Sequence, residues 1–336
     1  MAEVKRLSAS KVTCYMGCAM AYYLNYVKHE KTPTNVRLAF GKDIHYKLEE
    51  FYKKNFKSDE SFGKSWKWYW YRDISGDGLK GKAKRELEVK EYPFIVRDKE
   101  TGERIEKILR VGDHVNLGPE PVGVFFGYMK LGERILRNFY LKHKNRLKPA
   151  EVEFAFGRKK DDIVKIGDHE IAGVLDRVDK LEKRVGELNP GYYITDYKTD
   201  KKSPYTEDFA FNLHRHPQFS LYSAAFRTIF GEEEQGTFYY HLREGKRFIT
   251  HRSEKDFDYI KELLDHVAEG ISNDKFTPFY GFHCSFCDQK VNCEKYTVEH
   301  HGGPRIDKEN KIKTAREFDE WDVELPEWME MRAQEI

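Results

Sequence analysis

The sequence predicts a mixed α/β fold in which a helical N-terminal part precedes a sheet flanked by helices. Apolar residues recur at helical spacing in several segments up to residue 150. From residue 151 onward the spacing changes to roughly two, and turn pairs such as Gly167-Asp168 separate the apolar runs. A helix, two short strands and a last helix then follow, ending near Ser272. We therefore expect one sheet core, 151–272, joined to a helical part, 1–150.

Three helices are expected in the N-terminal part. The first is expected to have Ser10 as its N-cap and to contain Cys18. The second spans 41–52 and places His45 on the same side as Leu48 and Tyr52. The third begins at Pro121 and is long and amphipathic.

Two segments lie outside this pattern. Residues 58–113 are highly charged and poorly periodic, so they are interpreted as a helical insertion with loops. The aromatic cluster in this insertion, Trp66 to Tyr71, is expected to pack in the helical part rather than to stack on nucleic-acid bases. Residues 303–336 form an acidic tail with spaced aromatic residues, which would dock on the protein's own basic channel or on a partner, or simply pack.

Composition excludes some classes of protein and leaves nucleic-acid binding open. Aromatic residues make up 15% of the 336 residues, so much of the core should be aromatic. The formal net charge of +2 decides nothing, because binding depends on where the charges lie. No apolar run approaches the roughly 20 residues of a membrane helix. Since the N-terminus also lacks an apolar signal segment, we expect a soluble, cytoplasmic protein without membrane association.

Two acids and a lysine suggest metal-assisted chemistry on the sheet. Asp196 and Lys198 are two residues apart on a predicted strand, so their side chains should share one face. Asp176 lies at the end of another predicted strand and can reach the same edge. Carboxylate oxygens are the ligands that Mg²⁺ and Mn²⁺ prefer. Because phosphate hydrolysis needs an activated water and charge neutralisation, this trio is typical of a phosphodiester-cleaving site.

Three of the five cysteines lie within ten residues, at Cys284, Cys287 and Cys293. This spacing favours metal or cluster ligation in a reducing compartment over a disulfide framework. Thiolates select zinc, iron–sulfur clusters or copper(I), and a fourth ligand is missing locally.

Four motifs together resemble those of a known enzyme family. They are Gly41-Lys-Asp-Ile-His45, Gly173-Val-Leu-Asp176-Arg-Val-Asp179, Asp196-Tyr-Lys198-Thr199 and Gln218-Phe-Ser-Leu-Tyr222. In this order they resemble the motifs of the PD-(D/E)XK nuclease superfamily, specifically its RecB-like branch. The resemblance implies a restriction-endonuclease-like mixed sheet flanked by helices, with an N-terminal helical cap.

The resemblance also implies roles for the motif residues. His45, Asp176 and Asp196 would bind a Mg²⁺ or Mn²⁺ ion, and the Tyr197 carbonyl would add a further ligand. Lys198 would position or activate water. Gln218 and Tyr222, one helical turn apart, would contact DNA or hold Lys198. An acidic residue on the preceding strand often joins such sites, and Glu151 and Glu153 are equally good candidates for it.

Cys18 completes a four-cysteine pattern through the same resemblance. Related CRISPR-associated exonucleases and the nuclease domains of some helicase–nucleases carry one N-terminal and three C-terminal cysteines, which hold a [4Fe–4S] cluster. Cys18, Cys284, Cys287 and Cys293 match this pattern, with Ala19 where proline is usual. Zinc is the alternative, because Cys₄ zinc sites are common in nucleic-acid-binding proteins. The cluster segment, 273–302, would close a single nuclease domain, 1–302.

The sequence therefore predicts a metal-dependent DNA nuclease, specifically an exonuclease acting on single-stranded or frayed ends. One alternative is a nuclease-like module that binds DNA ends without cutting them. Another is an accessory subunit of a spacer-acquisition or helicase complex, with a protein partner in DNA repair, recombination or CRISPR adaptation. The basic residues expected to contact phosphates are Lys201, Lys202, His214, Arg215, His216 and the cluster from Lys142 to Lys148.

Overall fold

The computed structural model describes residues 6–97, 101, 103–145, 148–159, 162–201 and 208–301. It divides the chain into two compact units, 1–290 and 291–336, and each is described by itself. The tail expected at 303–336 lies outside the described residues, as do Lys202 and Arg146 of the expected basic groups.

Five strands form a mixed sheet in the described part of the first unit, in the order β11-β10-β9-β8-β5. Their bounds are Glu151–Phe156 for β5, Gly173–Leu181 for β8, Gly191–Lys198 for β9, Glu234–His241 for β10 and Lys246–Thr250 for β11. The pair β9 and β10 is parallel, and the other three neighbouring pairs are antiparallel. This confirms the predicted mixed sheet flanked by helices.

Strand β9 lies at the centre of this sheet and is rich in aromatic and β-branched residues, which favour strands. Ile194 belongs to the hydrophobic core on one face, and Tyr197 belongs to the core on the other face. Asp196, two residues from Ile194, is buried and stands opposite Tyr239 of β10. The alternation of side chains along β9 therefore directs Asp196 and Lys198 to the same face, as predicted.

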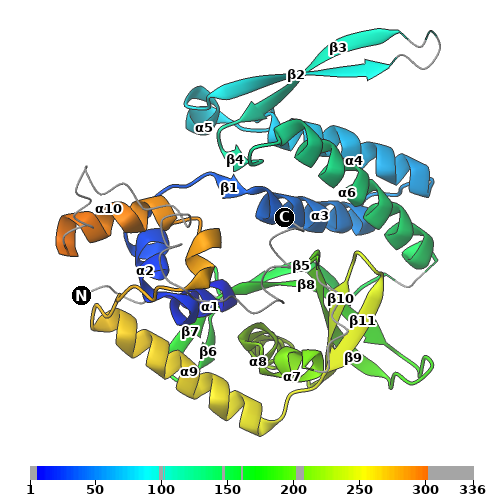
Figure 1. Cartoon of the computed structure of the whole chain (residues 1–336). Coiled ribbons are helices and arrows are strands. Elements are labelled where there is room, and N and C mark those ends of the chain that lie inside the picture. Colours follow the sequence, from blue (N-terminus) through cyan, green and yellow to red (C-terminus); the bar gives the residue numbers. More distant parts are fainter. Residues whose placement is uncertain are drawn as a thin grey trace, which may run out of the picture. The chain divides into compact units, whose positions relative to one another are not determined.

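Helices cover both faces of the sheet (Figure 1). On one face α1 (Ala9–Gly17), α8 (Pro217–Phe230) and α9 (Glu254–Ser272) pack on residues of β8 and β9. On the other face lie α3 (Val36–Lys53), α4 (Asp59–Ile74) and α6 (Pro121–His143). Helix α8 connects the parallel strands β9 and β10 and ends at Gly231, whose φ of 65° provides the left-handed C-cap.

Two residues of the aromatic cluster of α4 pack in the core of the helical part, as expected, whereas Trp68 and Tyr71 are exposed. Trp66 and Trp70 are fully buried and donate their indole N–H groups to the carbonyl oxygens of Met129 (2.8 Å) and Phe125 (3.1 Å) on α6. Trp66 lies so close to Gly132 that a Cβ atom there would be 2.2 Å from the ring. The absence of a side chain at Gly132 thus permits the close contact of α4 with α6.

The first helix differs from its prediction at both ends. Ser8, not Ser10, is the N-cap, because Ser8 has extended backbone angles and its Oγ accepts from the Lys11 amide. The helix ends at Gly17, and Cys18 lies between α1 and α2 (Ala19–Tyr22) with φ −165° and ψ 112°. Cys18 is therefore at a helix break and not inside a helix.

The interpretation of 58–113 as a helical insertion was only half right. After α4 and the short α5 (Gly81–Arg85), the strands β2 (Val89–Arg97) and β3 (Arg104–Gly112) form an antiparallel ribbon that projects from the helical part in Figure 1. Charged residues occupy both faces of the ribbon, which hides the strand period in the sequence.

Several short elements complete the described part. They are β1 (Thr34–Asn35), β4 (Val115–Asn116), β6 (Val164–Ile166), β7 (His169–Ile171), α7 (Phe209–Arg215), the π-helical turn Tyr23–Val27, the 3₁₀ turn Phe282–Phe286 and α10 (Lys290–His301). Among the described residues, no helix combines the length and apolar character needed to span a bilayer.

Candidate active site

The predicted motif residues meet in a cavity of about 1000 Å³ beside the C-terminal end of β9. Each comes from a regular element. His45 lies on α3, Asp176 on β8, Asp196 and Lys198 on β9, and Gln218 and Tyr222 on α8. The structure thus brings His45 and Tyr222, which are more than 170 positions apart in the sequence, into the same cavity.

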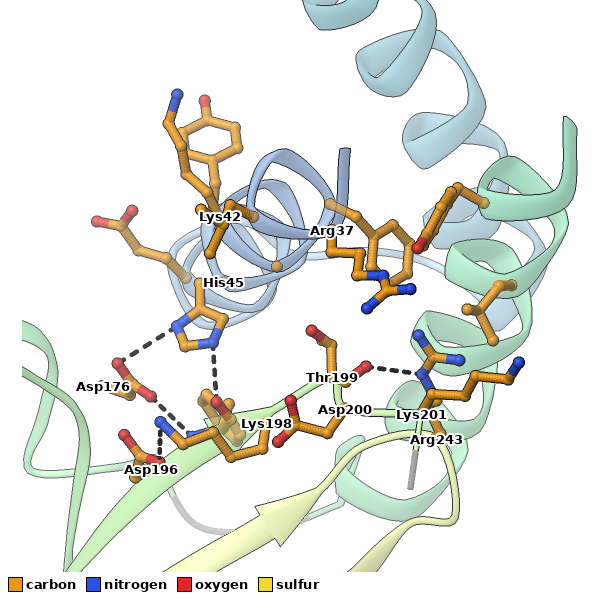
Figure 2. Close-up of a pocket in the computed structure, with 18 of the residues that line it drawn as sticks. Arg37, Lys42, His45, Asp176, Asp196, Lys198, Thr199, Asp200, Lys201 and Arg243 are labelled. Carbon is orange, nitrogen blue, oxygen red and sulfur yellow. Dashed lines mark hydrogen bonds and ion pairs between the residues drawn. The ribbon is translucent and has the colours of Figure 1, made fainter. Parts of the chain in front are cut away.

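His45 lies against the backbone of β9 and the carboxylates of its neighbours. Its Nε2 is 3.0 Å from the carbonyl oxygen of Tyr197, so Nε2 carries the proton and donates it. Its Nδ1 is 3.3 Å from Asp176 Oδ1 (Figure 2). The same nitrogen is 3.9 Å from Glu153 Oε1. Burial lowers the pKa of His45, but the attraction of Asp176 and other carboxylates outweighs it and raises the pKa to about 9.

Asp176 is buried and held by the neighbouring strand. Its Oδ2 accepts a hydrogen bond of 2.7 Å from the Tyr197 backbone N–H. Burial raises the pKa of Asp176, yet the charge and hydrogen bond of His45 outweigh burial and keep the pKa below its ordinary value. Asp176 is therefore a carboxylate with one oxygen anchored and the other, Oδ1, directed at His45.

Glu153, rather than Glu151, joins this group. The register of β5 with β8 pairs Val152 with Arg177 and Phe154 with Leu175, so Glu153 stands opposite Asp176. Glu153 has a φ of 50°, a left-handed conformation that costs a non-glycine residue about 1–3 kcal/mol. Burial and the Asp176 carboxylate raise the pKa of Glu153 to about 7, against the attraction of His45. The sequence left these two glutamates equivalent.

His45, Glu153 and Asp176 offer ligand atoms that all lie within 4.8 Å of one another. An imidazole nitrogen and two carboxylate oxygens suit a hard or borderline divalent cation. A cation would also neutralise the repulsion between the two carboxylates, which raises the pKa of Glu153 in the metal-free protein. The donor set of the site therefore fits a divalent metal ion.

Asp196 lies beside this group but has its own partners. Its Oδ2 is 2.8 Å from the Lys198 ammonium, and its Oδ1 accepts a 2.8 Å hydrogen bond from the Gln218 amide. Lys198 also donates to Gln218 Oε1 at 2.9 Å, and Gln218 Nε2 donates to the Tyr222 hydroxyl at 2.9 Å. Burial raises the pKa of Asp196 to about 6, while Lys198 opposes this shift.

Lys198 remains a cation in this network. Burial lowers the pKa of Lys198, but Asp196 outweighs burial, and the pKa lies above its ordinary value. Gln218 uses its carbonyl oxygen on Lys198 and its amide on Asp196 and Tyr222, so these contacts fix the direction of the lysine side chain. Gln218 and Tyr222 were expected either to contact DNA or to hold Lys198. The structure shows the contacts needed to hold Lys198, because Gln218 bonds to the lysine and Tyr222 bonds to Gln218.

The expected basic residues are divided between the cavity and other places. Lys201 lines the cavity. His214 instead pairs with Asp256 at 2.9 Å, and His216 Nδ1 accepts the Gln218 backbone N–H as the N-cap of α8. His143 is buried and contacts the Tyr240 hydroxyl at 3.1 Å, which excludes it from a phosphate-binding surface.

The cysteines of the first unit lie near one another. Burial raises the pKa of the Cys287 thiol, and the nearby Cys18 and Cys284 thiols raise it further, against a backbone hydrogen bond from Gln289. Gln289 also donates to Asn25 Oδ1 at 2.7 Å, which joins this segment to the N-terminal one.

Two further cysteines complete the set. Burial raises the pKa of Cys14 to about 11. Cys293 belongs to α10 in the second unit. None of the five cysteines, all of which the structure describes, forms a disulfide bond.

A mixed sheet that carries an Asp-x-Lys strand beside a His–Glu–Asp group defines a metal-dependent nuclease. The model of the PD-(D/E)XK nuclease superfamily matches residues 6–294, and the chain belongs to this superfamily. No curated protein matches the chain. Members of the superfamily are hydrolases that use divalent metal ions, and membership implies DNA as the substrate.

Proposed function

We propose that the protein is a Mg²⁺- or Mn²⁺-dependent exonuclease of the RecB-like branch that acts on single-stranded or frayed DNA ends. The observation that supports it most is the contiguity of the His45–Glu153–Asp176 group with the Asp196–Lys198–Gln218 network. The preference for single strands and free ends rests on the motif resemblance. A protein partner in repair, recombination or CRISPR adaptation belongs to the same proposal.

His45, Asp176 and Glu153 would hold the metal ion in this proposal, together with Asp196, which the motif resemblance also implies as a ligand. When bound, a divalent ion supplies Lewis-acid stabilisation of phosphate charge and lowers the pKa of water. The Tyr197 carbonyl accepts from His45 Nε2 and thereby leaves Nδ1 as the ligand nitrogen. Ligation by this carbonyl itself, which would use its second lone pair, stays a prediction.

Lys198 would orient the attacking water and stabilise developing negative charge on the phosphate. Its pKa lies above the ordinary value, so it acts as a cation and not as a general base near neutral pH. Gln218 holds the ammonium from the α8 side, and Asp196 holds it from its own strand. The lysine is thus positioned before DNA binds, which avoids reorganisation during the reaction.

The decisive experiment measures degradation of end-labelled DNA by wild-type protein, Asp176→Asn and Lys198→Ala with Mg²⁺ or Mn²⁺. Each variant is expected to lose about 100-fold or more of the rate, as when a transition-state contact is removed. Comparison of circular, linear single-stranded and end-blocked DNA then identifies an exonuclease. Unchanged degradation by both variants contradicts the proposal. Tight binding of DNA ends without divalent-dependent turnover would favour the end-binding or accessory role instead.

We also propose that Cys18, Cys284, Cys287 and Cys293 bind a [4Fe–4S] cluster that braces the nuclease domain, 1–302. The proposal is supported by the one-plus-three order of the cysteines and by the nearby Cys18 and Cys284 thiols, which help to raise the pKa of Cys287. Anaerobically purified protein should be brown and contain iron and acid-labile sulfide. Stoichiometric zinc without iron would contradict the cluster and establish the zinc alternative.

A further inference from the structure

The cavity that contains the motif residues has a second, basic end that the proposed chemistry does not use. Its lining includes Arg37 and Lys42 of α3, Lys201 after β9, and Arg243 in the turn between β10 and β11. Figure 2 shows the guanidinium groups of Arg37 and Arg243 pointing toward one another, while Lys42 extends away from them. The acidic end of the cavity is therefore continuous with a pair of converging cations.

Arg243 is fixed to the strand that carries the motif lysine. The residue before it, Leu242, donates its backbone N–H to the Lys198 carbonyl at 2.9 Å. Arg243 itself donates from Nε to the Thr199 carbonyl at 2.7 Å. Its turn is also tied to α6, because Lys142 Nζ donates to the Gly245 carbonyl at 2.8 Å. This use of Nε alone leaves the two terminal nitrogens of Arg243 without a hydrogen-bond partner among the described residues.

Arg37 is fixed from the other side of the cavity. It lies in the first turn of α3, where Asn35 Oδ1 accepts its backbone N–H at 2.9 Å. One turn later, a Cβ atom at Gly41 would lie 3.3 Å from Thr199 Oγ1, so α3 is close to the residue that anchors Arg243. The Arg37 side chain is exposed and forms no ion pair or hydrogen bond within the described part of the chain.

The two arginines differ from the paired arginines of the same unit. Arg177 has Asp179 at 2.7 Å, Arg227 has Glu234 at 2.9 Å, and Arg137 has Asp59 at 2.8 Å. Thr199, which accepts the hydrogen bond from Arg243, is followed by Asp200. The Asp200 carboxylate accepts a hydrogen bond from the Tyr239 hydroxyl at 3.0 Å rather than from Arg243. Two converging cations without a carboxylate between them are a binding site for an anion, and arginine forks match the oxygens of a phosphate.

We propose that Arg37 and Arg243 bind one backbone phosphate of a DNA strand next to the phosphate that is cleaved. This inference rests on the proposed function, because it takes the substrate of the neighbouring site to be DNA. Arg243 is bonded to Thr199, the residue after Lys198. A phosphate on Arg243 is therefore held in a fixed relation to Lys198, and the pair positions the strand in the site.

The test is the binding of a short fluorescein-labelled oligothymidylate, measured by fluorescence anisotropy in EDTA, where no metal-dependent cleavage occurs. Arg37→Ala and Arg243→Ala are each expected to weaken binding by about tenfold or more, as for hydrogen bonds to a charged group. The double variant, which leaves that phosphate without either arginine, should also reduce the magnitude of the slope of log K against log salt by about 0.7, the value for one phosphate contact on a single strand. Arg243→Lys should keep the salt slope and recover part of the affinity.

Arg184→Ala is the matched control. Arg184 is exposed in the turn between β8 and β9, at the other end of β9 from Lys198, and its Nε also donates to a backbone carbonyl, that of Gly186, at 3.1 Å. Its loss removes the same charge and should leave binding unchanged. Equal affinities of Arg37→Ala, Arg243→Ala and Arg184→Ala overturn the proposal. Because Arg37 anchors no other residue, its variant tests binding even if Arg243→Ala perturbs the fold.

A parallel cleavage assay with Mn²⁺ separates this inference from the proposed function. Cleavage by wild-type protein together with unchanged binding by both arginine variants would refute the phosphate site alone. Loss of binding by the arginine variants, with no cleavage by wild-type protein under any metal, would refute the nuclease and keep the phosphate site.

Discussion

Replacement of Glu153 by glutamine should stabilise the metal-free protein and reduce the stabilisation that a bound metal ion provides. In the metal-free protein the Glu153 and Asp176 oxygens lie within 4.8 Å, where two like charges repel by about 3 kcal/mol at an effective dielectric constant of 20. Burial and the Asp176 carboxylate together raise the Glu153 pKa from 4.5 to about 7, which corresponds to a cost of at most about 3 kcal/mol for the charged form, since solvent screens a partly exposed group.

The sign of the pH dependence follows from the direction of that pKa shift. Because the folded-state pKa of this acid is raised, its charge destabilises the fold. The cost is absent below about pH 4.5, grows as the pH rises through 7, and is complete at pH 8. Glu153→Gln should therefore raise the free energy of unfolding by up to about 3 kcal/mol at pH 8 in EDTA.

With Mn²⁺ the same variant should lose this advantage over wild type, because the bound metal ion stabilises the variant less. The substitution removes one of the three clustered ligand atoms. A hundredfold weaker affinity corresponds to about 2.7 kcal/mol less stabilisation at saturating metal. Chemical denaturation at pH 8, with EDTA and with Mn²⁺, measures both effects.

Glu151→Gln provides the control on the same strand and should change neither value. Two results would refute the reasoning. One is a Glu153→Gln protein that is less stable than wild type in EDTA. The other is a Glu153→Gln protein whose free energy of unfolding rises as much with Mn²⁺ as that of wild type.

Three further perturbations test other parts of the structure. Gln218→Ala removes an acceptor that holds the Lys198 ammonium, so kcat should fall about 10- to 100-fold with little change in KM. Steady-state kinetics on labelled DNA measure both constants, and a change in KM alone would contradict this role. Burial and a nearby carboxylate raise the pKa of Asp43 to about 8, so its charge lowers stability as the pH rises from 4 to 8, and Asp43→Asn should flatten the pH profile of the unfolding midpoint. Gly132→Ala should destabilise the protein by about 1–3 kcal/mol because its Cβ would overlap Trp66. Gly127→Ala, on the same helix, has open space around its Cβ and should stabilise the protein by about 1 kcal/mol. Equal denaturation midpoints of the two variants would contradict the packing argument.

The sequence was sufficient to predict residues that regular periodicity places. Asp196 and Lys198 share a face because they are two apart on a strand, and Gln218 reaches Tyr222 because they are four apart on a helix. The family match over residues 6–294 and the mixed sheet confirm the fold that these patterns predicted. The ligand roles of the motif residues stay predictions.

The parts that could not be predicted depend on backbone detail or on distant packing. The choice of Glu153 over Glu151 follows from the register of β5 with β8, which places Glu153 opposite Asp176 and which no residue pattern indicates. The ribbon of β2 and β3 was missed because Lys107 lies on its inner face and Ile95 is exposed on the other. Arg37 and Arg243 are separated by 206 positions (243 minus 37), and only the folded chain brings them to one cavity.

Strand β9 carries Asp196 and Lys198 and also lies at the centre of the sheet, so the geometry of these two residues depends on the sheet remaining folded. Its backbone pairs with β8 on one side and β10 on the other, and the Asp176 carboxylate takes the Tyr197 amide as well. Amide hydrogens of such a strand exchange with solvent only through large openings of the domain, not through local fraying. The Asp-x-Lys pair therefore belongs to the last part of the fold to open. On heating, its geometry should persist until the sheet itself unfolds.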